Sequence, residues 1–295
     1  MRRALEFLEH DDGRPVFLVV HTYRTHMPYR VGEVEDRAPW EELQAEVRGE
    51  LGQGLLKARK ELAPETWHAV LARTSDRYRS LYLQGVAALD AGFGDFLEGL
   101  APRGIGPRAY LFFTSDHGEA LGENDDIFHA GDLWESKLRI PLLARGPRFT
   151  PGSVPLAVTL LDLAPTLAEL AGVPADPRWS GSSLFALDRE RPAFAFRLQQ
   201  AERQLAISQG KHKLLTRRTE ALAAGDYDQA FDLAADPREE HDLHGGAAWG
   251  PGLAREGAHE LPRLLEPATG SVILQLTPEE LLKLNGLGYG ENEKD

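Results

Sequence analysis

Two short, continuous apolar runs that each lead into a polar cluster constrain the fold of this chain more than any other feature. Residues 16–20 are all apolar and are followed by His21. Residues 110–114 form a second run, which leads into Asp116 and His117. A run without alternating polar residues is typical of a strand buried on both faces, as in a parallel sheet. The sequence therefore predicts a mostly parallel sheet flanked by helices.

Helical patterns separate and follow these runs. Apolar residues recur at roughly helical spacing through residues 80–100, which predicts a helix packed on the sheet. Residues 140–144 form a further apolar run and predict another strand. Residues 161–172 predict a second helix, with Asp162 as its N-cap and Gly172 where it ends. Strands and helices in this order indicate an α/β core.

The pattern changes after residue 187. Residues 204–208 and 212–216 predict two short strands joined in a hairpin, and Thr277 begins a capping box that predicts a terminal helix. We therefore expect two parts. Residues 1–187 would form the α/β core, and residues 188–295 a small antiparallel sheet with a terminal helix.

Composition excludes several classes of function. The chain has 46 Asp and Glu against 33 Lys and Arg, a net charge of −13, which argues against a nucleic-acid binder. It has no Cys, which excludes disulfides, thiolate metal sites and a cysteine-derived nucleophile within this sequence. Acidic residues interrupt the first 12 residues, and the apolar runs are of strand length. We expect a soluble chain without a signal peptide or a membrane segment.

The polar clusters are the candidate site. Ligands of open α/β sheets bind beyond the carboxyl ends of the strands. The adjacent Asp116 and His117 suit a divalent cation, although the same pair also fits a helix N-cap and its neighbour. His26 and His129 are suited to contact an anionic substrate or to protonate a leaving group near neutral pH.

These clusters lie in segments that together resemble the sulfatases of the alkaline phosphatase superfamily. The region with a Ser-Asp-His-Gly-Glu turn, a His-containing loop and a following strand is similar to the corresponding region of that family. The resemblance extends upstream to a His-Thr-Tyr-x-x-His-x-Pro-Tyr segment and downstream through further matches in the same order. The matching segments are residues 17–29, 112–147, 160–173, 231–243 and 284–290.

The resemblance implies a metal-dependent hydrolase of small sulfate esters of a sugar or aryl alcohol, built on an alkaline-phosphatase-like core. Asp116 and His117 match the positions that coordinate the family's single divalent cation, usually Ca²⁺. His26 matches a histidine that contacts the sulfate. His129 lies where members carry a Lys or His that contacts sulfate and assists the leaving group. His21 lies nearby and is a further candidate for substrate binding.

The chain also departs from the family pattern. Sulfatases use a formylglycine nucleophile made from the Cys, or sometimes the Ser, of a C-x-P-x-R motif. No such residue is encoded here: the only Pro-x-Arg is Pro28-Tyr29-Arg30, which has His26 at the key position. The family's first strand, which ends in two metal-binding aspartates, is missing as well. We therefore expect a carboxyl-terminal fragment whose core is incomplete at the N-terminus, with a missing N-terminal half and no turnover on its own.

Two alternatives stay open. One is a phosphate or phosphonate ester hydrolase of the same superfamily. Its two-zinc members use an Asp-x-x-x-His motif, and Thr22 stands where that Asp would precede His26. The other is a non-catalytic remnant or module that binds an anion, a metal or a partner protein.

Overall fold

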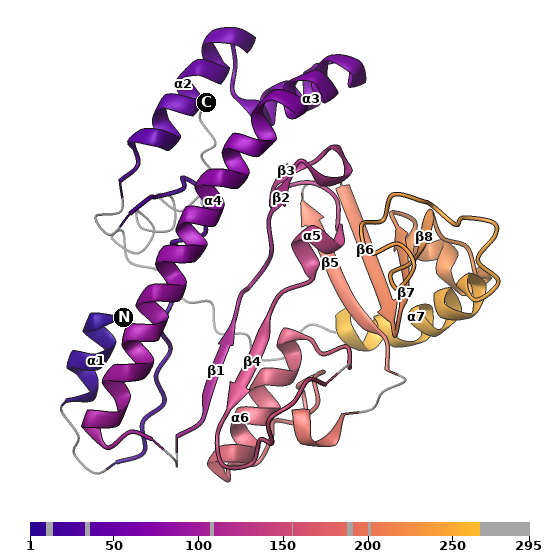
Figure 1. Cartoon of the computed structure of the whole chain (residues 1–295). Helices are drawn as coiled ribbons and strands as arrows, with labels where there is room; N and C mark the ends of the chain where they lie inside the picture. Colours follow the sequence, from indigo (N-terminus) through magenta and orange to yellow (C-terminus); the bar gives the residue numbers. More distant parts are fainter. Residues whose placement is uncertain are drawn as a thin grey trace. The chain divides into compact units, whose positions relative to one another are not determined.

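The structure is a computed structural model that describes residues 1–9, 14–32, 36–106, 109–154, 156–187, 191–199 and 202–265 (Figure 1). Packing divides the chain into two compact units. One comprises residues 1–158 and 188–257, and the other residues 159–187 and 258–295. The predicted terminal helix and the matching segment 284–290 lie outside the described residues. The predicted division at residue 187 stays a prediction.

A helical part opens the first unit. Its helices are α1 (Arg2–Leu8), α2 (Ala38–Leu51), α3 (Leu55–Glu61) and α4 (Pro64–Leu100), followed by the 3₁₀ turn η1 (Ala101–Arg103). The helix predicted over residues 80–100 is confirmed as the second half of α4, which has 37 residues. It begins earlier than predicted because Pro64 occupies the first turn, where its missing N–H costs nothing.

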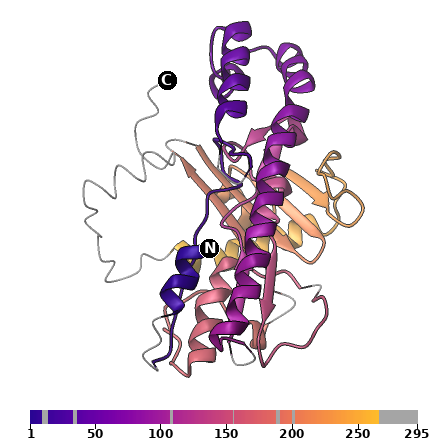
Figure 2. The same ribbon diagram turned by 60° about the vertical axis from the view of Figure 1, so that its left-hand side comes forward.

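The helices bury two apolar clusters along α4. Near its first half, α2 and α3 pack beside it and enclose an aromatic core that includes Tyr29, Tyr78 and Phe128. Near its last turns, Ala4 of α1 packs against Phe96 and Leu100. Figures 1 and 2 show α1 beside one end of the long helix and α2 and α3 beside the other. The helix α4 therefore packs against both α1 and Phe128, the residue that precedes His129.

The strands that follow α4 pair differently from the prediction. β1 (Leu111–Thr114) pairs with β4 (Leu142–Arg145), and β2 (Ala120–Leu121) pairs with β3 (Ile127–Phe128). The 3₁₀ turn η2 (Glu123–Asp125) joins β2 to β3, and α5 (Glu135–Leu138) precedes β4. Both pairs are antiparallel, as is every strand pair in the described residues, so the predicted parallel arrangement is not found there. The chain between β1 and β4 turns back on itself, whereas parallel strands need a crossover.

The strand predicted over residues 16–20 is absent as well. These residues have no regular secondary structure and pair with no strand of the described chain. Val16, Val19 and Val20 are exposed, as is Phe17, at 74%. Leu18 instead packs against the cluster formed by α1 and the end of α4. Apolar content alone does not make a strand, because a strand exists only when a neighbour satisfies its backbone hydrogen bonds.

The remaining strands of the first unit form one antiparallel sheet in the order β5-β6-β7-β8. They are β5 (Ala193–Gln199), β6 (Glu202–Gln209), β7 (His212–Thr216) and β8 (Gln229–Asp232), with η5 (Thr219–Ala224) before the last strand. The predicted hairpin is confirmed: β6 and β7 turn at Gly210, whose φ of 58° suits glycine. The helix α7 (Gly250–Leu265) follows the sheet.

The second unit contains η3 (Leu160–Asp162), α6 (Leu163–Ala171) and η4 (Leu184–Ala186). The helix predicted over residues 161–172 is confirmed, and Gly172 ends it with a φ of 67°. Asp162 occupies the N-cap position of α6, as predicted, but its side chain makes no capping hydrogen bond to that helix. The Asp162 carboxylate accepts hydrogen bonds from the backbone N–H groups of Thr159 and Ser182 and does not cap α6 itself. In the described part of the chain, no helix combines the length and apolar character needed to span a membrane.

Candidate functional site

Three imidazoles converge in the first unit: His26, His117 and His129. They come from the turn after residues 16–20, from the end of β1 and from the end of β3. The ring centroids are 4.5 Å apart for His117 and His129, 4.7 Å for His26 and His129, and 6.0 Å for His26 and His117. One ring nitrogen of each lies within 4.8 Å of those of the other two. The structure thus brings together residues that are up to 103 positions apart, counting 129 − 26.

A close backbone approach fixes the turn that carries His117. The Gly118 N–H donates to the carbonyl of Lys137 at 2.7 Å, and the Ser115 hydroxyl donates to the carbonyl of His117 at 2.6 Å. His117 Nδ1 lies 2.8 Å from the carbonyl oxygen of Gly118. The ring is therefore oriented by its own turn, which is held against α5.

We expect Gly118→Ala to disturb this turn. An added Cβ would lie 2.3 Å from the carbonyl oxygen of Ser136, and backbone cannot move away as a flexible side chain does. Overpacking of this kind costs about 1–3 kcal/mol, to be measured as a lower unfolding free energy in urea. Gly92→Ala is the matched control, because nothing lies within 4 Å of its added Cβ in α4. Equal stability of the two variants would contradict the close approach.

A strained residue precedes His129. Phe128 has a φ of 64°, a left-handed conformation that costs a residue with a side chain about 1–3 kcal/mol. Its ring is buried, 5.4 Å from that of Tyr78 and 5.7 Å from that of Trp40, measured between centroids. Packing of this ring in the aromatic core offsets the strain. The backbone then turns so that His129 leaves the core and faces the other two histidines.

Two buried groups that the sequence did not single out support His129. Its Nδ1 lies 3.0 Å from Oε1 of Glu119, and the Tyr29 hydroxyl donates to Oε2 of the same carboxylate at 3.0 Å. The Glu119 side chain is only 4% exposed, and Tyr29 is fully buried. Burial raises the pKa of the Tyr29 phenol, and Glu119 raises it further, so the hydroxyl stays a donor. The sequence placed both residues in the matching segments but could not show that they meet.

In each of the three histidine rings, Nδ1 faces an oxygen atom. His26 Nδ1 contacts the carbonyl oxygen of Met27, as His117 Nδ1 contacts Gly118 and His129 Nδ1 contacts Glu119. Carbonyl and carboxylate oxygens only accept, so each Nδ1 carries a proton and each neutral ring has its lone pair on Nε2. Burial lowers the pKa of His26, against the opposing effect of the Met27 carbonyl, and His129 lowers it further. The site thus favours the neutral form of His26.

The other two predicted site residues lie outside this trio. The Asp116 side chain is 58% exposed, and its Oδ1 lies 3.9 Å from His117 Nε2 and accepts the backbone N–H of His117 at 3.0 Å. Burial raises the pKa of Asp116, but His117 and backbone hydrogen bonds lower it overall, so the carboxylate is ionised. His21 is exposed and packs against Tyr23, with ring centroids 4.4 Å apart.

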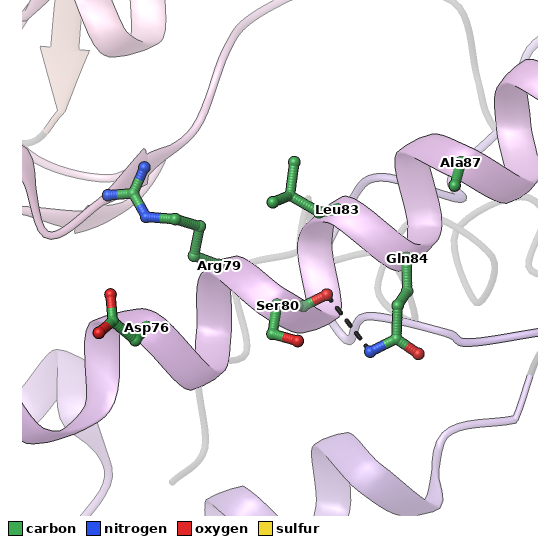
Figure 3. Close-up of a pocket in the computed structure, with 6 residues that line it drawn as sticks. All are labelled: Asp76, Arg79, Ser80, Leu83, Gln84 and Ala87. Atoms are coloured by element: carbon green, nitrogen blue, oxygen red, sulfur yellow. Dashed lines mark hydrogen bonds between the residues drawn. The ribbon is translucent and has the colours of Figure 1, made fainter.

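A concave surface lies elsewhere, along α4 (Figure 3). It is lined by one face of the helix: Asp76, Arg79, Ser80, Leu83, Gln84 and Ala87. The Arg79 guanidinium donates to Glu123 and to the carbonyl of Leu121, so it ties α4 to the β2 turn. This surface contains none of the predicted site residues. The three histidines are therefore the candidate site.

Comparisons with known proteins agree with the resemblance of these segments to the sulfatases. The Sulfatase family model matches residues 1–173. Arylsulfatase K of Xenopus laevis is 39% identical over 110 residues, which cover 37% of this chain and 20% of that protein. Choline-sulfatase of Rhizobium meliloti (strain 1021) is 31% identical over 172 residues, which cover 55% of this chain and 32% of that protein. The chain thus spans a third or less of the length of these relatives.

Solved structures show the same fold. One protein, solved in complex with its substrate D-glucosamine-2-N,6-O-disulfate, superposes with a TM-score of 0.51 at 24% identity, covering 80% of this chain and 47% of that one. A 2-O GAG sulfatase superposes with a TM-score of 0.52 at 15% identity, covering 89% and 57%. These neighbours have the alkaline-phosphatase-like fold. With a family model that matches more than half of its residues, this chain belongs to the Sulfatase family.

Proposed function

We propose that this chain carries the sulfate-binding part of a hydrolase of small sulfate esters. The observation that carries the proposal is the convergence of His26, His117 and His129 from separate segments of the sulfatase motif set. Two relatives are named for sulfate esters, as arylsulfatase and choline-sulfatase. One structural neighbour was solved with a disulfated glucosamine as its substrate. A sugar or aryl sulfate is the proposed substrate class.

The histidines have distinct proposed roles. His26 and His129 would bind the sulfate oxygens in their protonated form, with Nε2–H as donor. The negative charge of the bound sulfate would favour protonation of His26 and so oppose the effect of burial, which favours its neutral form. His129 would also give its proton to the bridging oxygen of the leaving group, as a general acid. The Glu119 carboxylate, held by Tyr29, would orient that ring and stabilise its positive charge. His21 is a further proposed substrate contact at the exposed side.

The metal implied by the resemblance does not fit the described residues well. We propose Asp116 and His117 as metal ligands, as the matching motif implies. Ca²⁺ takes six to eight oxygen ligands. Beside the three imidazoles, Asp116 offers a carboxylate, while the Glu119 carboxylate already accepts from His129 and Tyr29. The donors present are mainly nitrogen, so no step is assigned to calcium here.

The covalent step needs a residue that this sequence does not encode. With no Cys, the chain has no precursor for formylglycine within a C-x-P-x-R motif. We therefore propose that the chain binds sulfate but does not release product by itself. Turnover would require the nucleophile from outside these residues.

Imidazole NMR tests the proposal. Sodium sulfate is titrated at pH 6 into the chain kept free of metal with EDTA, and sodium phosphate is titrated in parallel. We expect sulfate to shift the signals of His26 and His129, and His129→Ala to weaken sulfate binding by about tenfold, the loss of one charge-assisted hydrogen bond. His259→Ala is the control, since that side chain is 86% exposed.

The outcomes separate the alternatives. A response to phosphate well above that to sulfate would favour the phosphate or phosphonate ester hydrolase. No shift with either anion, or an equal loss in the His259→Ala control, would overturn the proposed sulfate site.

A further inference from the structure

We propose that the Tyr23 ring, together with the neighbouring His21, forms an aromatic wall that contacts the alcohol part of the substrate. The wall would select sulfate esters whose alcohol carries a flat ring, either an aryl group or a sugar, over esters of acyclic alcohols. It can act only if the proposed function holds, because the ester would be held by its sulfate at His26 and His129. Tyr23 would then be a substrate contact that recognises the alcohol and leaves the sulfate to the histidines.

One tight turn carries both Tyr23 and His26. The carbonyl of Tyr23 accepts the backbone N–H of His26 at 3.1 Å, which is the hydrogen bond of a four-residue turn. The two ring centroids lie 5.9 Å apart, and the ring planes are nearly perpendicular, at 84°. The turn therefore places the Tyr23 ring directly beside a ring that would bind the sulfate.

Contacts on both sides hold this turn in place. The carbonyl oxygen of Arg24 lies so close to α4 that a Cβ added to Gly85 would be 2.6 Å from it. On the other side, Nη1 of Arg24 donates to the carbonyl of Gly32 at 2.7 Å. The aromatic wall is thus in position before a ligand binds, which lowers the entropy lost on binding.

The aromatic rings continue from the site toward solvent. Tyr23 packs against His21 with ring centroids 4.4 Å apart and planes tilted by 43°. His26 and Tyr23 are partly buried, whereas His21 is exposed. An incoming ring can therefore reach the wall from solvent without displacing the packed core. Ring centroids in aromatic pairs lie about 4.5–7 Å apart, so the wall can take one more ring in the same way.

The chemistry of the ester places its alcohol within reach of this wall. A bridging oxygen joins the sulfur to the first carbon of the alcohol, so the ring of an aryl or sugar ester begins directly beside the sulfate. With the sulfate at His26, Tyr23 is an adjoining ring whose side chain has no part in the proposed sulfate chemistry. An aryl ring would stack on it, and a pyranose would pack the C–H groups of its face on it by dispersion. An ethyl group offers neither face.

Binding of matched esters tests the wall. Ethyl sulfate, 4-nitrophenyl sulfate and glucose 6-sulfate carry the same single negative charge, so differences in affinity among them reflect the alcohol. Each is titrated into the full chain at pH 6 with EDTA, and the imidazole signals of His26 and His129 are followed by NMR. We expect at least one of the two ring esters to bind the original chain more tightly than ethyl sulfate does. The ratio of these affinities, ring ester to ethyl sulfate, measures the wall.

Variants of Tyr23 identify the residue. Tyr23→Ala should lower the ratio about 3- to 10-fold, the value of one aromatic contact. Tyr23→Leu should lower it as well, because leucine has bulk but no flat face, and it serves if Tyr23→Ala does not fold. Tyr23→Phe keeps the ring and should keep the ratio. Tyr110→Ala is the matched control: Tyr110 is also partly buried beside an aromatic ring, that of Phe149, but it precedes β1, whereas His117 follows that strand.

The outcomes separate the wall from the sulfate site. A lower ratio for 4-nitrophenyl sulfate in Tyr23→Ala would identify an aryl group as what the wall recognises, and a lower ratio for glucose 6-sulfate would identify a sugar. An unchanged ratio for both esters in the folded Tyr23→Ala or Tyr23→Leu variant would overturn the wall and leave the sulfate site intact, as would an equal fall in Tyr110→Ala or in Tyr23→Phe. If neither ethyl sulfate nor inorganic sulfate binds the original chain, the proposed function fails first, and the wall with it.

Discussion

Lys213→Met should lower the free energy of unfolding by about 3–5 kcal/mol, the loss typical of breaking a buried ion pair. Lys213 lies in β7 and is fully buried. Its Nζ lies 2.9 Å from Oε1 of Glu135, 2.7 Å from Oε1 of Glu239 and 2.8 Å from the carbonyl of Leu133. Methionine keeps the length of the side chain but removes the charge, so two carboxylates would then face an apolar group.

The loss should depend on pH. Burial raises the pKa of Glu239, and the charge of Lys213 opposes this rise, so removing Lys213 raises that pKa further. A carboxyl whose pKa is raised in the folded state stabilises below its unfolded pKa and loses this contribution as the pH rises through the folded value. The destabilisation should therefore be larger at pH 8 than at pH 5.

Urea denaturation of the full chain at both pH values measures the effect. Lys211→Met is the matched control, because Lys211 is 55% exposed and its pair with Asp232 is worth about 1 kcal/mol at most. The double variant Lys213→Met with Glu239→Gln should recover part of the loss, since it removes one uncompensated charge. Equal losses in Lys213→Met and Lys211→Met would show that the buried network does not stabilise this sheet.

Asp126→Asn should be similarly destabilising and should also disturb the histidine site. The Asp126 carboxylate is fully buried, pairs with the Lys137 ammonium and lies 2.9 Å from Nη1 of Arg59. It also accepts the Ile127 N–H at 2.7 Å. Asparagine is nearly isosteric but neutral, so two cations would lie side by side with a buried ammonium uncompensated. A loss of about 3 kcal/mol or more is expected.

The site is affected because the same lysine holds the loop that carries His129. Lys137 Nζ donates to the carbonyl of Ala130 at 2.7 Å, and the Lys137 carbonyl accepts the N–H of Gly118 at 2.7 Å. Loosening this network moves the segments of His129 and His117 relative to each other. Sulfate affinity of the folded variant, measured by the imidazole NMR titration, should therefore fall along with its stability.

Asp125→Asn is the control for this experiment. Asp125 is the preceding residue, is 61% exposed and pairs with the exposed His68. Its substitution should change the unfolding free energy by less than about 1 kcal/mol and leave sulfate binding intact. If Asp126→Asn were as stable as Asp125→Asn, the buried network would not be what holds the loop.

Part of the site could be read from the sequence. His26 and His117 follow apolar runs, and His129 lies in a segment that matches the same family, so their motif order was enough to name all three. The sequence could not show that the Asp116 side chain is exposed or that His21 packs against Tyr23. The direction of a side chain in a turn depends on the backbone conformation of that turn. The sequence also could not show that Tyr29 and Glu119 form a hydrogen bond, since these residues are 90 positions apart.

The sequence by itself determined the family, the helical second half of α4, the β6–β7 hairpin and the identity of the histidines, because these depend on local patterns and motif order. Only the tertiary structure decided strand direction, the absence of a strand at residues 16–20 and the burial of Lys213, Asp126 and Glu119. A strand needs a partner, and a charge becomes buried only when distant segments enclose it. Both depend on long-range packing, which periodicity along the chain does not encode.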